Sequence, residues 1–349
     1  MKKLNILMIG PARDVKGGMT SVIDGYYDCG LEKKIELKYV ETVNDKNILC
    51  KICKVIKGYT EFKKYISECD IVHVHMASRL STFRKCFYVR KAKKYNKKVI
   101  IHIHGAEFKV FYENECSCKK RKYIKDTLYM ADKIIVLSEK WKNYFSKLID
   151  RSKIEVLYNG IKIPSDFEKN LDTQKALFLG RLGKRKGIYD LIDVSKDIIK
   201  KYPKFHLYIG GDGEVENIKA IIKKQKLNKN IHYIGWIKNK EKERYLKECS
   251  IYILPSYNEG MPMSLIEGMS YKNVSISTNV GGIPEVIENE ENGLLIEPGN
   301  KEELYNAIDR ILANEKLRIK LSKNARKATE EKFNIEKNIK KLLSLYEKL

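Results

Sequence analysis

The chain has 349 residues, 43% of them hydrophobic, which is enough for the cores of two domains and excludes a disordered protein. No apolar run approaches the roughly 20 residues that a membrane-spanning helix needs. The net charge of +24 is uneven, because residues 1–165 carry 35 basic and 18 acidic side chains, and the rest carry 34 and 27. Such a field attracts nucleic acid, anionic lipid or phosphorylated substrates; drift of the composition toward lysine is the alternative explanation.

The first predicted element is a short apolar run, Asn5–Ile9. It imitates a signal peptide, but it is too short for one, Asn5 interrupts the apolar stretch, and Gly10-Pro11 ends it. We therefore expect a buried strand, and a cytoplasmic protein that is either free or peripheral on the inner face of the cytoplasmic membrane.

The eight cysteines fit that compartment. Cys50-x2-Cys53 and Cys116-x-Cys118 are the only close pairs, and neither has the nearby histidines or the convergent second pair of a zinc site. Reduced thiols are the favoured interpretation.

Short runs rich in Ile and Val alternate with helical stretches along the whole chain. This alternation predicts parallel sheets covered on both faces. In the first half the predicted strands are Asn5–Ile9, Ile71–Met76, Val99–His104, Lys133–Leu137 and Ile154–Leu157, and the helices include Met19–Tyr27, Thr60–Cys69, Ser81–Tyr95 and Lys119–Met130. In the second half the strands are Leu177–Leu179, Lys204–Ile209, Asn230–Ile234, Ser250–Leu254, Val274–Ser277 and Gly293–Ile296, with helices at Asp190–Lys201, Val215–Lys226, Lys240–Cys249 and Lys301–Asn314.

Turn residues cluster at 159–166 and predict a join between two doubly wound α/β domains, residues 1–165 and 166–333. Ligands of such sheets bind outside the carboxyl ends of the strands, so a cleft between two facing sheets is the expected site. The tail, residues 333–349, has the apolar stripe of a helix.

The segment 255–267 contains more candidate functional residues than any other part of the sequence. The strand Ser250–Leu254 leads into it, and Pro262 is predicted to begin a helix, because a proline at the first helical position loses no hydrogen bond. Glu259 precedes that helix and Glu267 lies inside it. The free amides at the helix start form a positive-ended pocket for an anion, which predicts a site for a phosphate-bearing ligand with hydroxyl groups. These amides belong to Met263, Ser264 and Leu265.

This run resembles the E-x7-E signature of retaining nucleotide-sugar glycosyltransferases of the GT-B architecture, in particular glycosyltransferase family 4. The resemblance covers most of the chain, and the joint order and spacing of its motifs make it specific. The other motifs are Gly17-Gly18, His102-Ile103-His104-Gly105, Asn159-Gly160-Ile161, Gly180-Arg181 with Lys186-Gly187, Gly210-Gly211-Asp212-Gly213 and Gly281-Gly282-Ile283-Pro284-Glu285. It implies two facing Rossmann-like domains with an interdomain cleft, the last helix, 334–349, crossing back to the first domain.

The resemblance implies that Arg181 and Lys186 hold the diphosphate of the donor. Both follow a strand directly, and cations there suit the negative charge that grows on a departing diphosphate. A solvated basic loop is the alternative. Gly17 and Gly18 resemble the loop that closes over the donor, since glycine lets the backbone approach a phosphate; a tight turn is the plain alternative.

Glu267 resembles the residue that binds the ribose hydroxyls, and Glu259 the one near the C3 and C4 hydroxyls of the sugar; a carboxylate offers two acceptor oxygens for such pairs. His104 resembles the histidine beside the donor sugar, so His104 and Glu259 are the candidate catalytic residues. We expect His102 to point to the opposite face of its strand and to be structural, and His75 to be a weaker candidate.

The sequence contains no Asp-x-Asp pair of the kind that holds a divalent ion in other nucleotide-sugar enzymes. Asp212, between glycines, is expected to shape a turn, and Gly281, Gly282 and Glu285 to shape the cleft floor. The prediction is activity without a cofactor or an obligatory metal, the nucleotide sugar being a co-substrate.

The predicted helix Ser81–Tyr95 is basic and contains Phe83 and Phe87, four residues apart. Such a helix can lie on an anionic membrane; equally, Phe87 can face the core and leave a solvated basic rim. The candidate acceptor or membrane residues are Glu107, Arg84, Lys85, Arg90 and Lys91.

The leading hypothesis is a retaining hexosyltransferase. It would move a hexose from a UDP-sugar to a lipid-linked saccharide acceptor in surface polysaccharide or glycolipid synthesis. A nucleotide-sugar epimerase or hydrolase on the same fold is the second. A basic nucleic-acid-binding protein is the third, weakened by the absence of a recognised nucleic-acid module.

Overall fold

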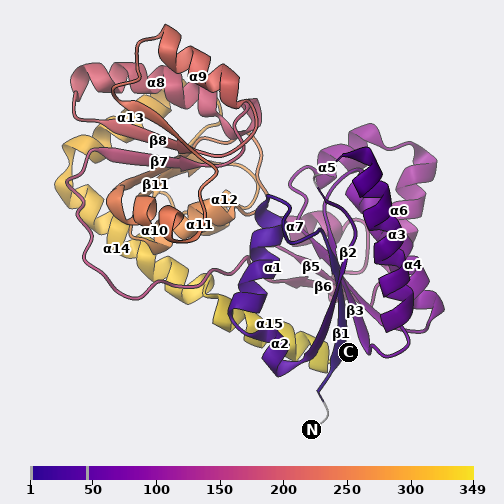
Figure 1. Cartoon of the computed structure of the whole chain (residues 1–349). Coiled ribbons are helices and arrows are strands. Elements are labelled where there is room, and N and C mark those ends of the chain that lie inside the picture. The colour runs from indigo at the N-terminus through magenta and orange to yellow at the C-terminus, as the bar shows by residue number, and fades with distance from the viewer. Residues whose placement is uncertain (1–2, 45–46) are drawn as a thin grey trace. The chain divides into compact units, whose positions relative to one another are not determined.

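A computed structural model describes residues 3–44 and 47–349 (Figure 1). The chain forms two compact units. Unit 1 comprises the chain up to Lys162 together with Asn334–Leu349, and unit 2 comprises Ile163–Phe333. Each unit contains a six-stranded parallel sheet, so the predicted α/β class with two doubly wound sheets is confirmed.

The sheet of unit 1 has the strand order β2-β1-β3-β4-β5-β6. The chain leaves β1 for β2 on one side and returns through β3 to build the other side, so the winding reverses between β1 and β3. The strands are β1 (Asn5–Gly10), β2 (Glu36–Glu41), β3 (Ile71–Met76), β4 (Lys98–Ile103), β5 (Lys133–Val136) and β6 (Ile154–Val156).

Helices cover both faces of this sheet. In Figure 1, α1 and α15 lie on one side of it, and α3, α4 and α6 on the other. The helices are α1 (Gly18–Asp28), α2 (Leu31–Lys34), α3 (Ile48–Tyr65), α4 (Leu80–Lys94), α5 (Phe108–Val110), α6 (Cys118–Met130), α7 (Glu139–Phe145) and α15 (Ile335–Glu347).

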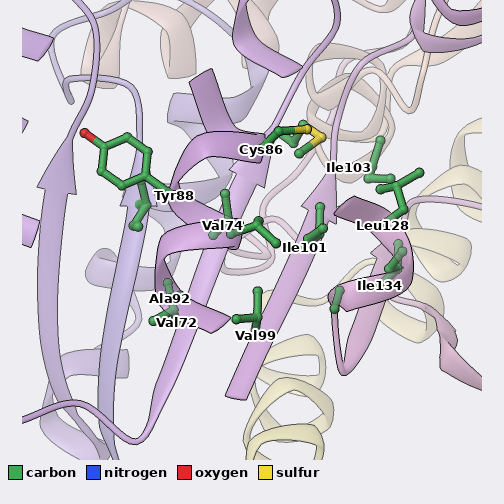
Figure 2. Packing of buried hydrophobic residues seen from close by; sticks show 14 of the residues in the cluster. Val72, Val74, Cys86, Tyr88, Ala92, Val99, Ile101, Ile103, Leu128 and Ile134 are labelled. Carbon is green, nitrogen blue, oxygen red and sulfur yellow. The ribbon is translucent and has the colours of Figure 1, made fainter. Parts of the chain in front are cut away.

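Alternation along the strands sorts side chains between the two faces. Val72 and Val74 of β3 and Ile101 of β4 belong to the apolar core, which also takes in Cys86 of α4 and Leu128 of α6 (Figure 2). The intervening residues of β3, His73 and His75, lie buried on the other face, where Tyr346 of α15 contacts His73.

The sheet of unit 2 has the order β12-β11-β10-β7-β8-β9, so its winding reverses between β7 and β10. Its strands are β7 (Lys175–Leu179), β8 (His206–Gly210), β9 (Ile231–Gly235), β10 (Ile251–Leu254), β11 (Val274–Thr278) and β12 (Leu294–Ile296). Its helices are α8 (Ile188–Lys201), α9 (Val215–Lys224), α10 (Asn239–Glu248), α11 (Met263–Ser270), α12 (Ile283–Val286), α13 (Lys301–Ala313) and α14 (Glu315–Lys332).

Several elements differ from the predictions, and helices α7 and α14 were not predicted at all. β2 was not predicted, because this edge strand has charged residues, Glu36 and Lys38, at its exposed positions and therefore no apolar run. Helix α3 starts at Ile48, twelve residues before the predicted Thr60. Helix α11 starts at Met263; Pro262 is its extended cap residue rather than its first helical residue. Within residues 3–44 and 47–349, no helix is both long and apolar enough to cross a bilayer.

Candidate functional site

The reversal of winding in unit 2 brings two loops to the carboxyl edge of its sheet. One follows β7 and contains the predicted Arg181 and Lys186, and the other follows β10 and contains Glu259. Because β7 and β10 are neighbours in the sheet, both loops start at the same edge. This is where doubly wound sheets bind their ligands.

Backbone contacts lock the two loops together. The amide of Tyr257 donates to the carbonyl of Arg185 over 2.8 Å, and the Arg185 guanidinium donates to the carbonyl of Asn258 over 2.9 Å. Gly187 has a φ of +69°, and a Cβ atom there would lie 1.9 Å from the carbonyl oxygen of Pro255. Glycine is therefore required at this crossing.

Glu259 is buried at the centre of this contact, with 5% of its surface exposed. Its Oε1 atom accepts hydrogen bonds from the ammonium group of Lys186 and, over 2.7 Å, from the hydroxyl of Ser256. Arg185 lies 3.9 Å from its Oε2 atom. A buried carboxylate needs such partners, so Glu259 holds Lys186 in a fixed place at the sheet edge.

Arg181 is the opposite case. It is exposed, and among residues 3–44 and 47–349 its guanidinium has neither a hydrogen-bond partner nor an ion-pair partner. The fold therefore leaves the donor groups of Arg181 available for an anion.

Helix α11 points its amino terminus at the same edge. The hydroxyl of Ser264 donates to the carbonyl of Leu179, the last residue of β7, over 3.0 Å, and the hydroxyl of Tyr252 reaches the same oxygen over 3.1 Å. The amides of Met263, Ser264 and Leu265 have no partner within the helix, since no turn precedes them. Pro262 provides no side-chain cap for them. The predicted anion pocket thus adjoins the loop that carries Arg181.

Glu267 lies further along α11. Its Oε1 atom is 2.7 Å from the ammonium group of Lys242 on α10, a partner that the sequence did not reveal. The predicted floor residues lie below the loop of Glu259: Gly281 has a φ of +57°, and a Cβ atom there would come within 1.7 Å of the carbonyl oxygen of Glu259. The amide of Gly282 donates to the carbonyl of Gly260 over 2.7 Å.

In unit 1, His104 follows β4 at the carboxyl edge, where its amide donates to the carbonyl of Met76 over 2.8 Å. Its Nε2 atom is 2.8 Å from Nδ1 of His75. Burial lowers the pKa of His104 to about 3. The imidazole is therefore neutral at physiological pH and can bind a hydroxyl group without bringing a charge.

The prediction that His102 points away from His104 is wrong. Residues two apart on a strand share a face, and the rings of His102 and His104 lie 4.1 Å apart. With His73 and His75 of β3 they form a four-histidine array, in which His73 accepts from or donates to Tyr346 over 2.6 Å. Burial holds the pKa of His75 and His102 well below the usual range and that of His73 at about 3.

Ring nitrogens of His73, His75 and His102 lie within 4.8 Å of one another, which is the spacing of a conceivable metal site. The rings of His73 and His75 are stacked at 4.5 Å and 13°, and His73 uses both nitrogens on Tyr346 and His102. Stacked rings do not converge their lone pairs on one point, as tetrahedral zinc requires. The array is better explained as neutral core packing.

The predicted acceptor residue Glu107 pairs with Arg79, which also holds Glu115 at 2.7 Å. Arg79 has a φ of +57°, a strained conformation for a residue with a side chain. Gly17 and Gly18 start α1 after β1, and Cβ atoms at either would meet no atom within 4 Å. The backbone there is open, and the close approach of a ligand remains a prediction.

The basic helix α4 does not present its cations as predicted. Lys85 is 1% exposed, and its ammonium group donates to the hydroxyl of Thr42 over 2.6 Å, because it shares a helical face with the buried Val89 and Ala92. Lys85 therefore cannot touch a membrane. Burial also holds its pKa well below the usual range.

The other predicted cations of α4, Arg84, Arg90 and Lys91, are all half-buried. Arg90 is engaged with α6, donating to the hydroxyl of Thr127 over 2.7 Å. Partial burial of Arg84 lowers its pKa, and Lys91 lies over the ring of Phe87.

Known proteins match the chain along most of its length. The family model described as Glycosyl transferases group 1 matches residues 161–328, and the one described as Glycosyltransferase Family 4 matches residues 35–163. An uncharacterized glycosyltransferase of Methanocaldococcus jannaschii is 30% identical over 281 residues, which cover 80% of this chain and 76% of the relative. The capsular polysaccharide biosynthesis glycosyltransferase CapM of Staphylococcus aureus is 28% identical over 243 residues, 64% of this chain and 63% of CapM.

Among solved structures, HepE of Anabaena in complex with UDP and glucose is similar over 99% of this chain and 100% of HepE. The TM-score is 0.77 and the sequence identity 16%. This likeness shows a common fold, the two-sheet GT-B architecture.

Proposed function

Since the chain belongs to the glycosyltransferases, and is thus a transferase, we propose that it moves a hexose from a UDP-sugar to a saccharide acceptor with retention at C1. One observation carries the donor half of this proposal. At the switch point of unit 2, the ammonium group of Lys186, the first amides of α11 and the guanidinium of Arg181, which has no partner among residues 3–44 and 47–349, surround one sheet edge.

These groups suit the leaving group. As the bond to C1 breaks, negative charge accumulates on the diphosphate, and donors that are already in place stabilise it without reorganisation. Arg181 can bind two phosphate oxygens with its planar fork, whereas Lys186 acts as a point charge. Glu259 positions Lys186 through their ion pair, in addition to its predicted contact with the C3 and C4 hydroxyls.

The ribose and the sugar complete the assignment. Glu267, on α11 beyond the amide pocket, offers its second carboxylate oxygen to the ribose hydroxyls while Lys242 holds the first. His104 uses Nε2 on His75, so Nδ1 remains for a sugar hydroxyl. A neutral ring fits this hydrogen-bonding role and not that of a general acid at neutral pH.

The acceptor is proposed to be a growing saccharide on a lipid carrier in surface polysaccharide or glycolipid synthesis, at the inner face of the cytoplasmic membrane. The match to CapM, named for capsular polysaccharide biosynthesis, supports a saccharide acceptor. The relatively basic first half of the chain, with +17 of the +24, suits an acceptor that carries a diphosphate or lies among anionic lipids.

The proposal is tested by release of UDP. A panel of UDP-sugars is first screened for thermal stabilisation, because a ligand that binds only the folded protein raises its melting temperature. With the best donor, we expect UDP release to depend on an added saccharide acceptor, and the product to keep the anomeric configuration by NMR. Release of UDP at the same rate without an acceptor would instead indicate a hydrolase. If none of the UDP-sugars raised the melting temperature, the proposed role of the site in binding the donor would be contradicted.

Metal removal gives a separate expected result. Because Arg181, Lys186 and the α11 amides supply the positive charge at the leaving group, we expect transfer rates in a chelator to stay within about twofold of those with magnesium or manganese. Loss of activity in the chelator, restored by added manganese, would show that a metal ion performs this task.

A further inference from the structure

Helix α3 carries an exposed apolar stripe that nothing in the proposed reaction uses. We define the α3 ridge as Ile48, Leu49, Ile52, Val55 and Ile56, whose exposed fractions are 75%, 74%, 52%, 40% and 60%. Their spacing places all five on one side of a helix. Scattered exposed apolar residues are normal, but a contiguous apolar stripe marks an interaction site.

The ridge is not a product of a frayed helix end. The side chain of Asn47 caps α3 by accepting from the amide of Cys50 over 2.9 Å. Further along, Phe62 and Ile66 are buried at 0% and 1%, so the same helix is anchored in the core.

The helix also cannot roll to bury the ridge. A Cβ atom at Gly58 would lie 2.5 Å from the carbonyl oxygen of Glu41, which shows how closely α3 crosses the end of β2. Lys54 forms an ion pair with the Glu41 carboxylate on that side. These contacts fix the rotation of α3 about its axis and hold the ridge toward solvent.

Basic side chains surround the ridge. Helix α3 carries five lysines against the single acid Glu61, and α4, whose Lys85 is buried, carries five further basic residues and no acid. Aromatic rings extend the apolar surface, because the rings of Tyr59 and Phe87 are 5.4 Å apart. Lys63 lies 4.9 Å from the ring of Tyr59, and Lys91 lies 5.7 Å from that of Phe87. The lysines of α3 are Lys51, Lys54, Lys57, Lys63 and Lys64.

From this surface we infer that unit 1 docks on an anionic membrane through the α3 ridge, not through the cations of α4 that the sequence indicated. An amphipathic helix of this kind lies in the interface with its apolar side among the acyl chains and its lysines among anionic headgroups. A second copy of the chain fits less well, because a symmetric contact would bring two strongly basic helices together.

The position of the α3 ridge in the fold relates membrane docking to the candidate site of unit 1. Helix α3 follows β2, so its most exposed end, at Ile48, lies toward the carboxyl edge of the unit 1 sheet, the edge that carries His104 and Glu107. This step rests on the proposed function, in which the acceptor is lipid-linked. Such an acceptor would reach the carboxyl edge of the unit 1 sheet from the membrane surface on which α3 lies.

The experiment is co-sedimentation of the full chain with phosphatidylglycerol and with phosphatidylcholine vesicles, without donor or acceptor. We expect salt-sensitive binding to phosphatidylglycerol only. The variant Ile52→Ser/Ile56→Ser should weaken it by about tenfold or more, and Lys51→Gln by about fivefold. Ile319→Ser in unit 2, where Ile319 is 51% exposed, is the matched control and should bind like the parent chain.

Equal binding by the ridge variant and the parent chain would overturn the inference, provided that thermal melting shows both to be folded. So would absent vesicle binding together with a dimer that the ridge variant loses, since the occupant would then be a second copy. Failure of transferase activity on a water-soluble acceptor would bear on the proposed function alone.

Discussion

Replacing Arg181 with alanine is expected to lower kcat/KM by about 30- to 1000-fold, which corresponds to about 2–4 kcal/mol of transition-state stabilisation. The reason is that the guanidinium is exposed and has no partner in the described part of the chain. The folded protein does not use it, so we expect the free energy of unfolding to change by less than about 0.5 kcal/mol. Steady-state kinetics with the best UDP-sugar and urea unfolding measure the two effects separately.

Lys184→Ala is the matched control for this variant. Lys184 is also an exposed cation and lies three residues along the same loop, but it has no assigned contact with the donor. Its removal should leave kcat/KM within about twofold. If Arg181→Ala and Lys184→Ala had the same small effect on kcat/KM, the loop would contribute only its general positive charge, and Arg181 would make no specific contact with the phosphate.

Unit 1 is expected to lose stability steeply between pH 7 and pH 5. His73, His75 and His102 are fully buried, and burial lowers the pKa of His73 and His104 to about 3. In the unfolded chain a histidine takes up a proton near pH 6.5, whereas the folded protein excludes it. The unfolded state therefore binds more protons as the pH falls, and each histidine that stays neutral costs about 2 kcal/mol over this interval.

The two tryptophans allow the units to be followed one at a time. Trp141 belongs to unit 1 and Trp236 to unit 2, so urea unfolding of a Trp236→Phe variant by fluorescence reports on unit 1, and that of a Trp141→Phe variant on unit 2. Unit 2 contains only His206 and His232, of which the second has a pKa lowered by partial burial, and should be less sensitive. Equal pH dependence of the two units would show that the four-histidine array is not held neutral.

The sequence predicted the buried strands well because their signal is local. Ile71–Met76 is observed as predicted, since a run buried on both faces is apolar from end to end apart from its histidines. Strand β2 was not predicted because its exposed positions carry charged residues. The start of α3 was not predicted because its apolar stripe faces solvent, where the pattern of a core-facing helix does not apply.

Part of the site could also be predicted because its signal is local in the sequence. Arg181, Lys186, Glu259 and the start of α11 lie within two short motifs, and the fold brings those motifs to one sheet edge. Their partners are distant in sequence: Lys242 lies 25 residues before Glu267, and no local pattern pairs the two. The position of His102 was a different kind of error, since the period of two along a strand already places it beside His104.

The most direct test of the donor site is a crystal structure of the chain with UDP bound. We expect the diphosphate at the carboxyl edge of the unit 2 sheet, where it accepts hydrogen bonds from Arg181, Lys186 and amides at the start of α11, and the ribose at Glu267. A diphosphate bound elsewhere, with Arg181 and the α11 amides still facing solvent, would contradict this expectation.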